Sequence, residues 1–108
     1  LSGEDGTALP FLAQGGHGCI SVTANIAPKL CSLMHNHWIQ NNYKEAFQTN
    51  IKLAKLNHAM FIETSPGPVK YAAELLGICL SDTRLPLTSI KDTTKKVVEG
   101  AMKEIGLI

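Results

Sequence analysis

The sequence has no long apolar run, no excess of charge of one sign and few aromatic side chains. Ten lysine and arginine residues balance nine aspartate and glutamate residues, and aromatic residues make up 6% of the 108 residues. A chain without a basic block lacks the electrostatic footprint of a protein that binds nucleic acid or an anionic membrane. No stretch approaches the roughly 20 apolar residues of a membrane span, and none has the pattern of a secretory signal. We therefore expect neither nucleic acid nor a membrane as a partner.

Cysteine is scarce, and the number and spacing of the cysteines do not indicate a disulfide framework. Cys19, Cys31 and Cys79 are odd in number and form no C-x-x-C pair, which favours reduced thiols and a cytoplasmic location. Cys31 and His35 share one face of a helix at i, i+4, but His37 points about 200° away from that face on a 3.6-residue period. We expect no metal site.

The motifs of several enzyme classes are also missing. The nucleophile motif G-x-S-x-G does not occur, and Ser21 lies inside a predicted strand with no base beside it in sequence. The glycines of residues 15–18 follow a helix and precede a strand, the reverse of a phosphate-binding loop. No lysine occupies the desolvated strand end that an imine-forming lysine needs. We therefore expect no catalytic residue within these 108 residues and no cofactor.

What the sequence does contain is a helix–strand–helix pattern. A helix starting near Glu4 ends at the glycine pair 15–16, a short apolar strand runs from Gly18 to about Val22, and Pro28 opens the next helix. This order is typical of an α/β barrel or a doubly wound sheet. Further helices are predicted at about 28–41, 43–62, 66–76 and 92–105, so the chain should be mainly helical with one or two short parallel strands.

The longest predicted helix carries an apolar stripe at i, i+4, i+7, i+11 and i+14, which we expect to be buried. The stripe comprises Phe47, Ile51, Ala54, His58 and Phe61.

Three segments resemble one known family. Residues 15–25, Gly-Gly-His-Gly-Cys-Ile-Ser-Val-Thr-Ala-Asn, resemble the last barrel strand of the dihydrodipicolinate synthase family, within the pyruvate-dependent class I aldolases. Residues 65–70, Ser-Pro-Gly-Pro-Val-Lys, resemble its Asn-Pro-x-Pro-Val-Lys helix start, with Ser65 in place of the usual asparagine. Residues 84–88, Arg-Leu-Pro-Leu-Thr, resemble the segment before its final helix. Order and spacing agree as well, so the resemblance covers almost the whole chain.

The resemblance implies a (β/α)8 barrel, but such a barrel takes roughly 250 residues and this chain has 108. We therefore expect the C-terminal portion of a barrel plus an appended helical bundle. Residues 1–41 would hold the last barrel strands with their helices, and residues 42–108 the C-terminal helical region. The Schiff-base lysine and the proton-relay residues of the family would lie outside this chain, which alone should be inactive.

The family's activity is that of a lyase, which condenses pyruvate with aspartate semialdehyde through a lysine Schiff base in lysine and diaminopimelate biosynthesis. The resemblance implies that the backbone at Ile20 contacts bound pyruvate and that Gly3 borders the same pocket. It also implies a cytoplasmic homo-oligomer, a homotetramer in this family. Two alternatives remain at this point: a related pyruvate aldolase such as an N-acetylneuraminate lyase, and a non-enzymatic helical interaction module.

Overall fold

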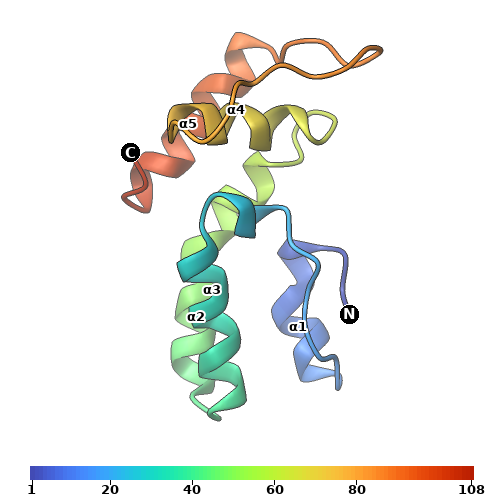
Figure 1. The fold of residues 1–108 in the computed structure, drawn as a ribbon. Coiled ribbons are helices and arrows are strands. Elements are labelled where there is room, and N and C mark those ends of the chain that lie inside the picture. The colour runs from blue at the N-terminus through green and yellow to red at the C-terminus, as the bar shows by residue number, and fades with distance from the viewer. The chain divides into compact units, whose positions relative to one another are not determined.

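The computed structural model describes residues 1–108 and is mainly helical (Figure 1). The chain divides into two compact units, residues 1–54 and 55–108, each considered below by itself. The division falls inside one long helix, α3 (Tyr43–Ala59). The proposed domain limits, 1–41 and 42–108, stay a prediction. No helix combines the length and the apolar character that a membrane crossing requires.

The first unit is built around three helical segments. A 3-10 turn, η1 (Asp5–Thr7), leads into α1 (Ala8–Ala13), and a second 3-10 turn, η2 (Thr23–Asn25), precedes α2 (Pro28–Ile39). Proline at the first position of α2 is favoured because its missing N–H has no partner there in any case. The α1, α2 and α3 segments share one apolar cluster, formed by Ala8, Leu9, Leu12, Met34, Ala46 and Leu53.

The predicted stop at the glycine pair after α1 is confirmed. Gly15 has φ +93°, and its N–H donates to Leu12 O at 3.0 Å, while Gly16 N–H donates to Phe11 O at 2.9 Å. A Cβ on Gly16 would lie 2.2 Å from the Phe11 ring and 2.7 Å from Phe11 O. The helix end therefore needs a residue without a side chain at position 16.

The predicted short strands do not form. One parallel bridge joins Ser2 to Cys19, so the two segments run in the expected direction but form no extended strand. Val22 already has helical angles, φ −76° and ψ −46°, and precedes η2. The extension of the strand to Val22 was wrong because the N–H groups of Val22 and Thr23 bond to a carboxylate instead of a neighbouring strand.

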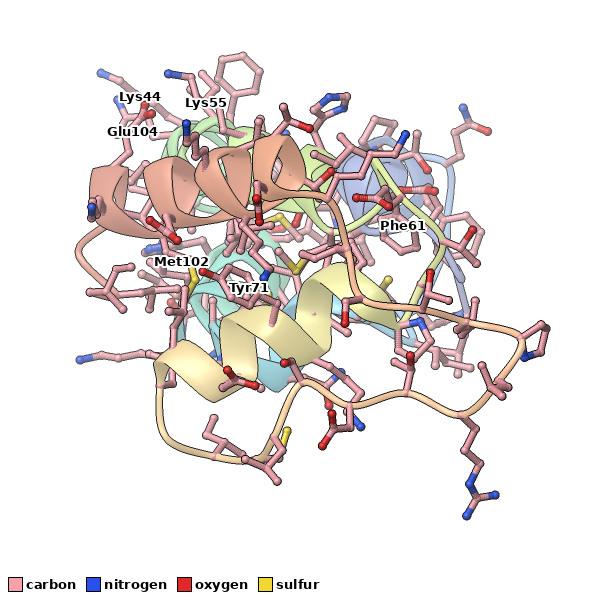
Figure 2. All side chains as sticks on the ribbon, turned by 90° about the horizontal axis from the view of Figure 1, so that it is seen from above. Lys44, Lys55, Phe61, Tyr71, Met102 and Glu104 are labelled. Carbon is pink, nitrogen blue, oxygen red and sulfur yellow. The ribbon has the colours of Figure 1, made fainter.

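The second unit packs α4 (Gly67–Leu75) against α5 (Asp92–Glu104). The side chains of Tyr71 and Met102 lie between these two helices in Figure 2. The Tyr71 hydroxyl donates to Glu99 Oε1 at 2.5 Å. Both helices bury small or flexible apolar side chains, namely Val69, Ala72, Ala73, Val98, Ala101 and Met102.

The segment between α4 and α5 has no regular structure but is fixed at several points. Gly77, at φ +72°, follows α4 as predicted. Ser81 N–H donates to Glu74 Oε2 at 2.5 Å, and the Lys70 ammonium donates to the carbonyl of Asp82. At the far end, Lys91 N–H donates to Glu63 Oε2 at 2.9 Å, just before α5 begins. The hydrogen bonds of Glu63 to Thr94 and to Lys91 hold its carboxyl pKa below the ordinary value.

The predicted buried stripe of α3 was wrong. Phe47, Ile51 and Phe61 are 57%, 55% and 42% exposed, and Ala54 and His58 are exposed too. A second stripe lies one or two residues earlier in register and extends one residue past the helix end. That stripe is buried: Ala46, Thr49, Leu53, Leu56 and Met60. Both stripes follow helical periodicity, so periodicity alone could not distinguish the inward face.

Candidate active-site segment

The candidate site begins at the parallel bridge. Ser2 N–H donates to Gly18 O and Ile20 N–H donates to Ser2 O, both at 2.8 Å. Because the two segments run parallel, Gly3 and Ile20 lie next to each other where both segments end. Ile20 is 71% exposed, and a Cβ on Gly3 would meet no atom within 4 Å. The two predicted binding residues are thus brought together, with open space beside them.

No backbone N–H donates to the Ile20 carbonyl oxygen. Its amide, by contrast, is used in the bridge to Ser2. The Ile20 carbonyl is therefore a backbone acceptor without a backbone partner, while the side chain of Ile20 offers only apolar surface.

The loop after Ile20 is held by the carboxylate of Asp5. The Ser21 hydroxyl donates to Asp5 Oδ1, and the N–H groups of Val22 and Thr23 donate to Asp5 Oδ2 at 2.9 and 3.1 Å. Ser21 Oγ in turn accepts from Ala24 N–H at 2.8 Å. Asp5 is only 7% exposed, and the donors at the start of η2 offset the cost of burying its charge.

The loop after Ser2 is fixed in a similar way. Ser2 Oγ accepts from Glu4 N–H at 3.1 Å, and the Glu4 carboxylate accepts from Gly6 N–H at 2.8 Å. Gly3 therefore lies between two residues whose positions are determined by local hydrogen bonds.

Thiols near this site are held neutral. Burial, followed by the negative charge of Asp5, raises the pKa of both Cys19 and Cys31. Burial lowers the pKa of His35, against the smaller opposing effect of Asp5. Protonated thiols are poor nucleophiles and metal ligands, so neither cysteine is set up for covalent catalysis.

No group of three or more histidine, cysteine, aspartate or glutamate side chains is arranged to hold a metal ion. The lysines are equally unsuited to imine formation. Lys55 pairs with Glu104 at 2.8 Å with both side chains exposed, as Figure 2 shows, and none of the lysines is buried. An imine-forming lysine needs a desolvated position, and every lysine here is exposed or only partly buried.

The second unit has one larger concavity of its own, with a volume of about 230 Å³. It lies between the end of the loop before α4 and the segment before α5, and its lining includes Glu63, Gly67 and Pro86. No lysine, arginine, histidine or cysteine side chain lines it.

The model of the dihydrodipicolinate synthetase family matches residues 1–105. The chain belongs to this family. It is 54% identical over all 108 residues to the 4-hydroxy-tetrahydrodipicolinate synthase of Rhodospirillum centenum, and 48% identical to that of Bartonella bacilliformis. In both cases the chain spans 37% of the relative's length.

Solved structures of dihydrodipicolinate synthases contain a segment with the same fold as this chain. A dihydrodipicolinate synthase from Thermotoga maritima superposes with a TM-score of 0.97 at 36% identity, over 99% of this chain and 36% of that one. A chloride-inhibited enzyme from Acinetobacter baumannii, solved in complex with pyruvate, gives a TM-score of 0.93 at 38% identity, over 99% and 37% of the two chains.

Sequence reasoning missed the role of Asp5. Acidic side chains favour the start of a helix, and Asp5 lies in the first turn of η1. Its carboxylate, however, crosses to a loop 16 residues further along the chain. Local patterns carry no signal for such a contact; only the pairing of the two segments could have indicated it.

Proposed function

We propose that this chain is the C-terminal part of a (β/α)8-barrel lyase that condenses pyruvate with aspartate semialdehyde. The lysine that forms the imine with pyruvate lies in the part of the enzyme outside these 108 residues. The observation that carries this proposal is the end-to-end match, at 54% identity, to a 4-hydroxy-tetrahydrodipicolinate synthase. The product belongs to lysine and diaminopimelate biosynthesis, and the enzyme works in the cytoplasm as a homo-oligomer.

Within that enzyme, the role of this chain is to form one wall of the pyruvate site. Barrel enzymes place their chemistry at the carboxyl ends of the strands, which is where Gly3 and Ile20 lie side by side. The Ile20 carbonyl faces the ligand as a backbone acceptor. Gly3 leaves space because it has no side chain.

A chimeric enzyme tests this function. The 108 residues replace the matching 37% of the Rhodospirillum centenum synthase, and the chimera is assayed with pyruvate and aspartate semialdehyde. We expect turnover within about tenfold of the parent, which corresponds to a difference of about 1.4 kcal/mol in transition-state stabilisation. A chimera that melts cooperatively but does not turn over these substrates contradicts the proposal.

A further inference from the structure

One carboxylate connects the two segments that carry Gly3 and Ile20. Asp5 lies two residues after Gly3, and its three donors lie in residues 21–23, directly after Ile20. The bridge between Ser2 and Cys19 joins the same two segments on the other side of Gly3 and Ile20. Both candidate binding residues are therefore enclosed between two cross-links.

The geometry of this contact requires a carboxylate. Asp5 Oδ1 accepts from the Ser21 hydroxyl, while Asp5 Oδ2 accepts from two backbone N–H groups. An asparagine offers only one acceptor oxygen, so its NH₂ group would face a donor on one side. A glutamate keeps both acceptors but is longer by one methylene, so it can restore part of the contact.

Ser21 shares a peptide bond with the Ile20 carbonyl. Its hydroxyl donates to Asp5 and accepts from Ala24 N–H. These two hydrogen bonds fix the orientation of the Ser21 side chain. Because the Ile20 carbonyl belongs to the Ile20–Ser21 peptide, fixing Ser21 limits rotation of that peptide. Nothing else in the backbone holds the carbonyl oxygen.

We propose that Asp5 is a positioning residue for the pyruvate site, which, acting through Ser21, sets the direction of the Ile20 carbonyl. The inference rests on the proposed function. Asp5 contacts the loop and not the substrate. Its effect is therefore on pyruvate binding, and the chemistry of the imine lysine is unaffected.

The test compares Asp5→Asn, Asp5→Glu and Ser21→Ala in the chimera, with Asp82→Asn as the control for loss of an exposed carboxylate. For Asp5→Asn we expect the KM for pyruvate to rise by about tenfold or more, since small misplacements of binding groups have large effects. The KM for aspartate semialdehyde and the kcat at saturating pyruvate should change by less than about threefold. Asp5→Glu should recover part of the pyruvate affinity, and Asp82→Asn should match the parent.

A second readout does not depend on activity. Burial raises the pKa of Cys31 most, and the charge of Asp5 raises it further. Asp5→Asn should therefore speed alkylation of the Cys31 thiol at mildly alkaline pH, and Asp82→Asn should not. If Asp5→Asn does not fold, Ser21→Ala decides: a raised pyruvate KM supports the inference.

The outcomes separate the two proposals. An inactive parent chimera argues against the proposed function. An active parent whose folded Asp5→Asn and Ser21→Ala variants keep the pyruvate KM overturns the positioning role alone. A fall in kcat with a similar rise in both KM values also overturns it, because such a combined change indicates a general structural defect.

Discussion

At the residue scale, the backbone carries the candidate site and buried polar groups hold that backbone in place. Gly3 contributes the absence of a side chain, and Ile20 contributes a carbonyl with no other partner. Asp5 is the one buried charge in the segment, and charged acceptors make hydrogen bonds about twice as strong as neutral ones. Gly3 and Ile20 are predicted as binding residues from motif resemblance, and that assignment stays a prediction. The contribution of Asp5 could not be predicted from the sequence, because it depends on a contact between distant residues.

A backbone role predicts tolerance at position 20. In the chimera, Ile20→Val should keep the pyruvate KM within about twofold and change the free energy of unfolding by less than about 0.5 kcal/mol, since the side chain is exposed. Ile20→Pro removes the N–H that donates to Ser2 O and should lose most pyruvate affinity. Steady-state kinetics and thermal melts measure both variants. If Ile20→Val abolishes pyruvate use while the fold survives, the contact is made by the side chain.

At the element scale, local signals determined the helices but not the faces they bury. Proline at the start of α2 and glycine after α1 and α4 set helix ends within a few residues of those predicted. On α3, however, two stripes have helical periodicity, and only the structure shows that the one with Ala46 and Leu53, which pack with α1 and α2, is the buried one. The predicted strand is reduced to one bridge for a similar reason, because the carboxylate of Asp5 accepts from the N–H groups of Val22 and Thr23.

The contact between α4 and α5 gives a test of helix packing. The hydrogen bond to Glu99, followed by burial and nearby negative charge, raises the pKa of Tyr71 to about 12. A phenol whose folded pKa lies above its unfolded value of about 10 stabilises the fold fully below pH 10, and that contribution is lost as the pH rises towards 12.

In a Tyr43→Phe background, which leaves Tyr71 as the only tyrosine, tyrosinate absorbance should show half-ionisation near pH 12. Glu99→Gln should move this midpoint towards 10, the ordinary value for tyrosine. Glu104→Gln makes the same charge change on α5 but lies outside the contact, and it should leave the midpoint near that of the parent. A Tyr71 midpoint that does not respond to Glu99→Gln contradicts the hydrogen bond between the two helices.

At the scale of the whole molecule, many large hydrophobic side chains lie on the surface. Large hydrophobic side chains are exposed in both units, among them Ile20, Phe47, Ile51, Phe61 and Leu80. Exposed apolar groups of this extent mark surfaces that pack against other protein. They accord with a chain that spans 37% of the length of the relatives that it matches.

The central claim is that these residues form a wall of the pyruvate site while the imine lysine lies elsewhere in the enzyme. The most direct measurement is to incubate the chimera with pyruvate, reduce it with borohydride and locate the adduct by peptide mass mapping, with the isolated 108-residue chain treated in parallel. The account predicts one stoichiometric adduct, on a lysine outside the grafted residues, and none on the isolated chain. A stoichiometric adduct on any lysine within the 108 residues, or a folded chimera that forms none, would contradict it.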